Sequence, residues 1–292
     1  MNKLFKTLIY DGQVSLSVAD TTDMVNDAIK IHGLSATCAA ALGRTMTAAT
    51  FMASGLKSDG DRLSVTVAGD GACGKITVCG NGKLFMRGSV QNGKADLPVR
   101  ADGKLDVGGI VGKNGRLTVV KSMGLKDPYS GTAKLVSGEI AEDFAAYYAY
   151  SEQIPTAIAL GVKIDKDLSC MGAGGVIVQA MPFAEEVNLA KAEETVKKLS
   201  NVSALIKTLG AEGIMKEYFG CTDGYSRYYP QYKCACSREK TADILRSLGK
   251  AEVDAIIAEE GVIKVNCEFC NAEYVFDKSQ AEELFADSLK DE

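Results

Sequence analysis

Four of the nine cysteines lie in two close pairs near the C-terminal end of the sequence. Cys234 and Cys236 flank one alanine, Cys267 and Cys270 flank a Glu-Phe dipeptide, and thirty residues separate the two pairs. Two such pairs, joined by an insert of small-domain size, supply the four thiolates of a tetrahedral zinc site. Sulfur ligands also favour zinc over harder cations. The spacing therefore predicts a zinc site formed by all four cysteines.

Other interpretations of these four cysteines stay open. An iron–sulfur cluster also takes four thiolate ligands, and four unrelated buried cysteines would give the same count. Most four-cysteine zinc sites are structural and switch nothing. The only histidine, His32, lies far away in the sequence, so a ligand set that includes histidine has little support.

The residues after the first pair predict a helix that begins beside it. Ser237 is a suitable N-cap for a helix that runs to about Leu248, which places Cys236 just before the helix N-terminus. The positive end of the helix dipole favours the thiolate form of Cys236, and Lys233 and Arg238 nearby have the same effect.

The second pair is expected in a knuckle between two short strands, residues 262–266 and 273–276. A small C-terminal domain buries little apolar surface, whereas a structural zinc ion contributes about 10–16 kcal/mol to folding. A metal that ties the two pairs together would hold the whole domain in shape. Its loss would loosen the domain and expose apolar surface, so the site is a candidate switch.

The rest of the chain predicts an α+β fold, in which a compact core of antiparallel sheets and helices precedes a helical linker and the small zinc-binding domain. Short strands separated by glycine-rich turns indicate antiparallel pairing. The predicted strands are residues 14–18, 63–68, 75–79, 84–88, 116–121, 156–163 and 175–181. The predicted helices are residues 20–31, 35–56, 139–152, 185–199, 202–209 and 214–219.

Three segments follow from these patterns. Residues 1–182 form the α+β core, which ends near Pro182. Residues 183–232 form a helical linker that lies on the core and ends in a cluster of tyrosines. Residues 233–292 form the four-cysteine zinc domain.

Composition limits the cellular setting and the partners. Of the 292 residues, 46% are hydrophobic and 24% are charged, as in ordinary globular proteins. The N-terminus has no signal-peptide core, and residues 35–56 contain Arg44 and four threonines, so they predict a buried core helix and no membrane span. Residues 233–292 carry a net charge of −6, which disfavours nucleic acid. A cytoplasmic protein without membrane or nucleic-acid partners is expected.

Three other features of the sequence resemble functional sites but are interpreted as structural or of minor importance. Residues 69–74 satisfy a glycine-rich phosphate-binding pattern, but a strand follows them, so a tight hairpin turn is predicted. Glu142 and Asp143 form no matched acid and base, and no enzyme activity is expected. The unpaired cysteines Cys38, Cys73, Cys79 and Cys170 are interpreted as core residues, and Cys221 as a candidate for auxiliary redox reactivity.

The two cysteine motifs and several other segments together resemble the 33-kilodalton heat-shock protein family of redox-regulated chaperones. The similarity covers nearly the whole chain. It is carried by residues 234–239 and 267–270, by Gly43-Arg44, and by residues 135–143, 151–156 and 174–182.

The resemblance implies a chaperone that is inactive while it is reduced and binds one zinc per chain. Oxidative stress would release the zinc and form disulfides, with Cys234–Cys236 and Cys267–Cys270 as the two pairs. Each disulfide closes only a small ring, so neither would restore the lost restraint. The resemblance also implies that the activated protein is a homodimer that holds unfolding client proteins without ATP.

Two other classes of protein remain as rivals. A zinc ribbon that binds nucleic acid would use the same cysteine spacing, but the acidic charge of residues 233–292 disfavours it. A thiol–disulfide oxidoreductase could use Cys267 and Cys270. Such enzymes present the pair at a helix N-terminus, whereas here the pair lies between two predicted strands.

Overall fold

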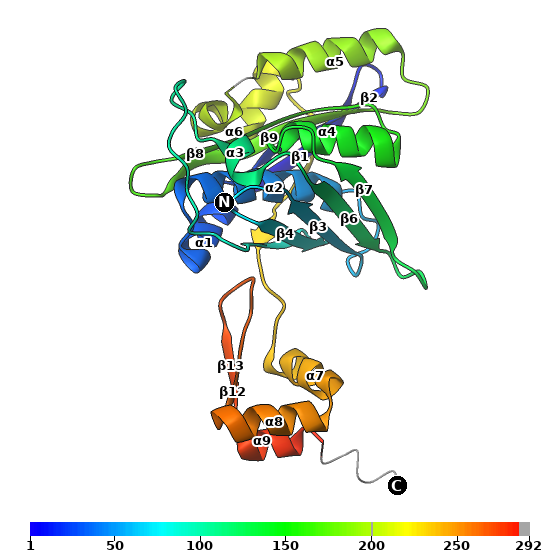
Figure 1. The fold of residues 1–292 in the computed structure, drawn as a ribbon. Coiled ribbons are helices and arrows are strands. Elements are labelled where there is room, and N and C mark those ends of the chain that lie inside the picture. The colour runs from blue at the N-terminus through cyan, green and yellow to red at the C-terminus, as the bar shows by residue number, and fades with distance from the viewer. Residues whose placement is uncertain (200, 286–292) are drawn as a thin grey trace. The chain divides into compact units, whose positions relative to one another are not determined.

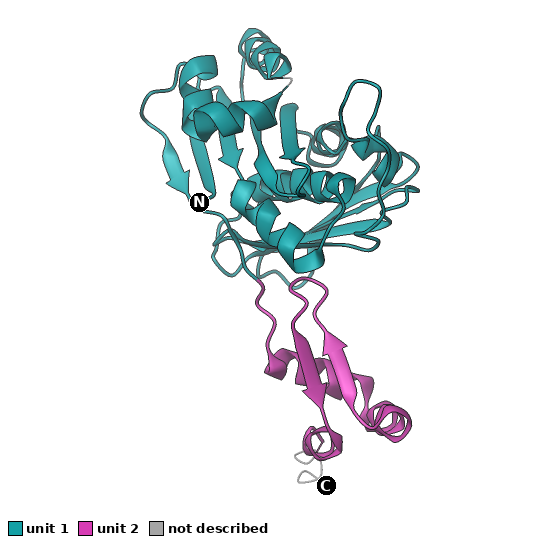
Figure 2. Cartoon of the chain, turned by 90° about the vertical axis from the view of Figure 1, so that its left-hand side faces the viewer, with its two compact units in different colours: residues 1–233 teal, residues 234–292 magenta. Residues whose placement is uncertain are grey.

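The structure is a computed structural model that describes residues 1–199 and 201–285. The chain divides into two compact units, unit 1 (Met1–Lys233) and unit 2 (Cys234–Glu292), which Figure 2 colours separately. Each unit has an apolar core of its own. Within the described residues, no helix combines the length and the apolar character needed to cross a membrane.

Unit 1 contains two sheets with the strand orders β10-β1-β2-β9-β8 and β11-β5-β4-β3-β6-β7. All neighbours are antiparallel except β11, which runs parallel to β5. The first sheet consists of β1 (Lys3–Ile9), β2 (Val14–Asp20), β8 (Thr156–Ile164), β9 (Cys170–Ala180) and β10 (Ser226–Tyr228). The second consists of β3 (Arg62–Ala68), β4 (Lys75–Asn81), β5 (Phe85–Val90), β6 (Arg116–Ser122), β7 (Tyr129–Lys134) and β11 (Gln231–Tyr232).

A buried helix, α2 (Ala36–Ala53), packs against strands of both sheets (Figure 1). Ser35 caps it by accepting a hydrogen bond from the Cys38 amide, as expected for a helix that begins after this serine. All four of its threonines are buried, and the hydroxyls of three of them donate to the carbonyl four residues back (Thr45, Thr47 and Thr50). These internal hydrogen bonds let a helix with polar residues lie inside the core. The prediction of a core helix is confirmed.

Other helices complete the first part of unit 1. They are α1 (Thr22–His32), α3 (Val107–Val111) and α4 (Ala141–Tyr147), which continues into a π-helical turn, η1 (Tyr148–Glu152). Gly33 ends α1 in the left-handed conformation (φ 55°), as predicted from its position. The predicted helix at 139–152 therefore exists, but its last turn is wider than an α-helical turn.

Two further helices cover the five-stranded sheet on the face opposite α2. They are α5 (Glu186–Lys198) and α6 (Val202–Phe219), which pack with β1, β2 and β9 around a second apolar cluster (Figure 1). Gly210 interrupts α6 with φ 68°, close to the boundary predicted between two shorter helices. Ile214 and Met215 of α6 are completely buried in this cluster.

The aromatic end of the predicted linker is extended and not helical. Residues 226–233, here called the strap, place β10 beside β1 and β11 beside β5. The amides of Gln231 and Lys233 donate to the Leu84 and Met86 carbonyls (3.0 and 2.8 Å). The strap thus pairs with one edge of each sheet, along β1 in the first sheet and along β5 in the second. Its extended conformation depends on these distant strands, so the local sequence did not predict it.

Unit 2 is a small α+β domain. It contains α7 (Arg238–Leu248), α8 (Lys250–Glu260), the antiparallel pair β12 (Ile263–Asn266) and β13 (Glu273–Phe276), and α9 (Lys278–Glu283). Its core is a short set of buried apolar side chains, namely Ala242, Leu245, Val253, Ile263, Phe276 and Ala281. The prediction of an α+β fold, with antiparallel sheets before a C-terminal four-cysteine domain, is confirmed.

Candidate metal centre

The four cysteines of unit 2 form one cluster, and their Sγ atoms all lie within 4.8 Å of one another. Cys234 Sγ lies 3.6 Å from Cys267 Sγ, and Cys236 Sγ lies 3.3 Å from Cys270 Sγ. Tetrahedral zinc with bonds of about 2.3 Å separates its sulfur ligands by about 3.8 Å. The cluster therefore has the composition and the spacing of a four-thiolate metal site.

The first pair is positioned by the start of α7. Cys236 directly precedes Ser237, whose hydroxyl accepts a hydrogen bond from the Lys240 amide (3.3 Å), so the predicted N-cap is confirmed. The two cations expected to act on Cys236 point to other groups. Arg238 donates to the Val275 carbonyl, and the Lys233 ammonium lies 4.3 Å from the ring centre of Phe85.

The second pair is positioned by the turn between β12 and β13. The Cys267 amide donates to the Ala272 carbonyl, and the Asn271 amide donates to the Cys267 carbonyl (2.9 Å each). Asn271 adopts a left-handed conformation with φ 56°, which closes this tight turn. The knuckle predicted from the alternating residues on either side is thus present, and it holds Cys267 and Cys270 side by side.

One further side chain belongs to this site and was not predicted from the sequence, namely Tyr274 in β13. Its hydroxyl lies 3.1 Å from Cys236 Sγ. No spacing rule links position 274 to position 236. The one indication available was its position four residues after Cys270 in a predicted strand. That strand belongs to the hairpin that holds the second pair, so its side chains lie near the cluster.

The thiol pKa differs among the cysteines of the cluster. Burial raises the pKa of Cys234 to about 12, and it raises that of Cys270 as well. At Cys236 burial acts in the same sense, but the hydrogen bonds of Tyr274 and of the other cysteines outweigh it and lower the pKa to about 7. Cys236 is therefore more readily ionised than Cys234 or Cys270. A bound cation would favour the thiolate form of all of them.

The remaining five cysteines lie outside this cluster. Cys38, Cys73 and Cys170 are buried in unit 1, and burial raises the pKa of each, to about 12 for Cys73 and about 11 for Cys170. Burial also raises the pKa of Cys221, whose thiol donates to the Phe219 carbonyl (3.6 Å). Neutral thiols react slowly, so none of these four has the environment of a reactive cysteine. Cys79 is half-buried, 3.7 Å from Ser64 Oγ.

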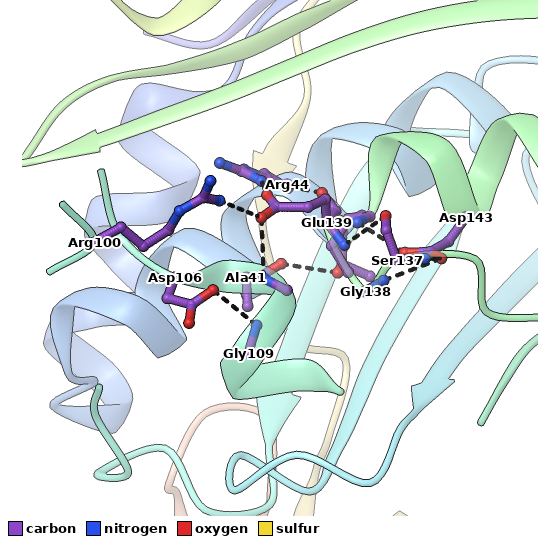
Figure 3. Close-up of polar contacts among 12 residues, drawn as sticks. Ala41, Arg44, Arg100, Asp106, Gly109, Ser137, Gly138, Glu139 and Asp143 are labelled. Atoms are coloured by element: carbon purple, nitrogen blue, oxygen red, sulfur yellow. Dashed lines mark hydrogen bonds and ion pairs between the residues drawn. The ribbon is translucent and has the colours of Figure 1, made fainter. Parts of the chain in front are cut away.

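A second polar cluster, in unit 1, joins Arg44 of α2 to Ser137, Gly138, Glu139 and Asp143 (Figure 3). Arg44 Nη1 donates to the Glu139 carboxylate (2.5 Å) and to its backbone carbonyl (3.1 Å). Glu139 also accepts from the Gly108 amide and from Arg100 (3.3 Å each). Glu139 thus joins α2, α3 and residue 100 to one loop.

Asp143, in the first turn of α4, fixes the same loop. Its side chain is completely buried and accepts from four backbone amides, those of residues 136, 137, 138 and 140, at 2.7–3.3 Å. Asp143 therefore does more than place a negative charge at the start of a helix, because it holds the backbone of the preceding loop. The carboxylates of Glu139 and Asp143 therefore bind structural partners and position this loop.

The glycine-rich residues 69–74 connect the antiparallel strands β3 and β4, so the prediction of a hairpin turn is confirmed. A Cβ atom at Gly69 or Gly71 would lie 2.1 or 2.2 Å from the carbonyl oxygens of Val111 and Ile110. Glycine is required here because two backbone segments pack directly against each other.

The fold and the site together define a class of protein: an α+β unit of two sheets around a buried helix, followed by a small domain with a four-thiolate metal centre. The chain matches the Hsp33 protein family over residues 2–277 and belongs to that family. The family is one of chaperones, and the resemblance drawn from the sequence is confirmed.

Similar proteins extend over the same length. The 33 kDa chaperonin of Clostridium acetobutylicum is 39% identical over 287 residues, with 97% of each chain covered. That of Bacillus pumilus is 40% identical over 286 residues, with 97% of this chain and 98% of the relative covered. The crystal structure of the Thermotoga maritima 33 kDa chaperonin has a TM-score of 0.90 at 33% identity, with 99% of both chains covered.

Proposed function

We propose that this chain is a redox-regulated, ATP-independent holdase and not an enzyme. In the reduced state Cys234, Cys236, Cys267 and Cys270 would hold one zinc ion per chain, which would supply a cross-link between the two halves of unit 2. On oxidative stress the cysteines form the disulfides Cys234–Cys236 and Cys267–Cys270, release the metal, and unit 2 loses its fold. The observation that carries this proposal is the four-sulfur cluster.

The small core of unit 2 supports a switch at this site. In the part of unit 2 that the structure describes, the apolar core consists of six buried side chains and six partly buried ones that pack against them. The cluster joins residues 234 and 236, which precede α7, to the turn of the β12–β13 hairpin. A structural zinc site contributes about 10–16 kcal/mol to folding. The free energy lost with the metal therefore exceeds the stability that so small a core can supply. All six sulfur–sulfur distances are within 4.8 Å, so the geometry is compatible with the proposed pairing without selecting it.

Unfolding of unit 2 has a direct route into unit 1 through the strap. Lys233, the residue before Cys234, is hydrogen-bonded to Met86, and Asn2 Nδ2 donates to the Pro230 carbonyl (3.1 Å). We assign residues 1–182 as the chaperone core, 183–232 as the linker that gates it, and 233–292 as the redox switch. Release of the linker uncovers the apolar face under α5 and α6 and the edges of β1 and β5.

Unfolding client proteins are the proposed partners, because they expose apolar side chains and unpaired strand edges that match such a surface. The activated form is a homodimer, and the cytoplasm is the compartment in which a reversible thiol switch operates. The net charge of −6 on residues 233–292 argues against nucleic acid as a partner.

The decisive experiment measures light scattering from a thermally unfolding client. Reduced, zinc-loaded protein is compared with protein treated with peroxide at raised temperature, while a dye reports released zinc. Protection in the oxidised sample alone, together with zinc release, supports the proposal. Zinc release without protection rejects the chaperone switch, and absence of bound zinc rejects the metal site. A Cys221→Ser variant, which changes a cysteine outside the cluster, is the matched control and is expected to behave as the wild type.

A further inference from the structure

The hydroxyl of Tyr274 makes a direct contact with the sulfur cluster. Tyr274 Oη lies 3.1 Å from Cys236 Sγ. A phenol O–H is a stronger donor than a thiol, and a thiolate is only an acceptor, so the sulfur accepts this hydrogen bond. Hydrogen bonds to metal-bound sulfurs belong to the outer shell that orients the ligands and tunes the site.

The position of this hydroxyl is fixed by the hairpin of unit 2. Tyr274 faces Val265 across the β12–β13 pair, and both side chains pack against the apolar core of the unit. The turn of the same hairpin carries Cys267 and Cys270. Tyr274 therefore links Cys236, from the first cysteine pair, to the strands that position the second pair.

We propose that Tyr274 is a positioning residue of the metal centre, which holds the Cys236 sulfur in place and slows the opening of the site by oxidants. This inference rests on the zinc site proposed above. Two physical effects act in the same direction. The hydrogen bond restrains Cys236 as a ligand. A metal-bound sulfur is already a thiolate, so the hydrogen bond does not raise the amount of nucleophile there; it stabilises the negative charge and makes that thiolate a weaker nucleophile.

The step that Tyr274 slows is attack of sulfur on peroxide. A cysteine thiolate bonds to one peroxide oxygen, the O–O bond breaks, and hydroxide leaves, so that the sulfur becomes a sulfenic acid. A second cysteine thiolate then displaces hydroxide and forms the disulfide. The two sulfurs supply two electrons, and with two protons peroxide becomes two molecules of water. Without the Tyr274 hydroxyl, Cys236 enters this sequence faster.

The test is a Tyr274→Phe variant of the full-length protein, because this change removes the hydroxyl and keeps the ring in the core. Tyr150→Phe, at a residue that is 81% exposed, is the matched control. Zinc affinity is measured by competition with a chelator, and zinc release by a dye during peroxide treatment. Cobalt(II) in place of zinc reports the sulfur environment through its thiolate-to-metal absorption, which a purely structural role would not shift.

Tyr274→Phe is expected to weaken zinc binding at least about tenfold, to speed peroxide-driven release, and to shift the cobalt absorption while keeping its four-thiolate form. Affinity and release rate within twofold of the wild type, or an equal change in Tyr150→Phe, would overturn the inference. Client protection is recorded separately. If oxidised wild type gives no protection but the Tyr274 effects on metal persist, the chaperone function fails and this inference stands.

Discussion

Replacement of Ile214 by alanine tests whether the helical layer of α5 and α6 gates the chaperone surface. Ile214 is completely buried in the cluster that holds α6 against the five-stranded sheet. Loss of a buried isoleucine side chain to alanine costs about 2–5 kcal/mol. For a unit of this size, each kcal/mol lowers the melting temperature by about 2–4 °C, so a fall of about 4–20 °C is expected.

The functional expectation is that Ile214→Ala protects a client while it is still reduced and zinc-loaded, because α6 separates from the sheet without help from unit 2. Ile76→Ala is the matched control. Ile76 is also completely buried in unit 1, but it lies in the core between α2 and the six-stranded sheet. Melting is followed by circular dichroism, client protection by light scattering, and zinc content by a dye assay.

Two results would refute this reasoning. Equal protection by the reduced forms of both variants would mean that general destabilisation, and not release of α6, exposes the client surface. A lowered melting temperature in Ile214→Ala without protection in the reduced state would mean that the face under α6 binds no clients.

Four further predictions address the metal site, the strap and the core. Cys234→Ser removes one of four thiolates, so zinc stoichiometry or affinity measured by chelator competition falls; unchanged binding would remove the site as assigned. Tyr232→Glu replaces a hydroxyl that donates to the Gly88 carbonyl (3.0 Å) with a negative charge, which cannot donate and is repelled by that carbonyl. The strap should therefore loosen, and a redox titration should reach half-maximal client protection at a lower peroxide concentration. Asp143→Ala leaves four backbone amides without their acceptor, two of them in buried hydrogen bonds (Gly138 and Ile140). A buried amide without a partner costs about 1–3 kcal/mol, so urea unfolding should reveal a loss of about 2–6 kcal/mol. Hydrogen bonds from Asn114 hold the pKa of Asp70 below its usual value of 3.8. The stabilising effect of the carboxylate is therefore complete above the unfolded-state pKa and is lost as pH falls through the lower folded-state pKa. Asp70→Asn should differ from the wild type in urea unfolding at pH 7, and the difference should shrink as the pH is lowered below the usual value; a difference that does not change with pH would contradict this.

Much of the fold follows from local patterns in the sequence. The strands of the six-stranded sheet with alternating apolar residues were predicted within one or two residues, and β7 was not. β7 has glycine and alanine on its inward face, at Gly131 and Ala133, and therefore lacks an apolar alternation. α8 was missed for a similar reason, since Val253 is its one fully buried residue.

Segments that depend on distant partners were the least predictable. β10 and β11 are short, and the strands with which they pair decide their conformation. The sulfur cluster could be predicted because metal coordination fixes the spacing of its ligands. The contact of Tyr274 with Cys236 could not, because it depends on how the hairpin packs beside the start of α7.

The strap also sets the order in which unit 1 is completed on the ribosome. Asn2 and Pro230 are 228 residues apart in the chain and are joined by a hydrogen bond in the fold. At about 5–20 residues per second, synthesis reaches Pro230 about 10–50 s after Asn2. Throughout that interval the outer edge of β1 has no partner strand. The nascent protein therefore carries an open sheet edge of its own, and translation itself determines when that edge closes.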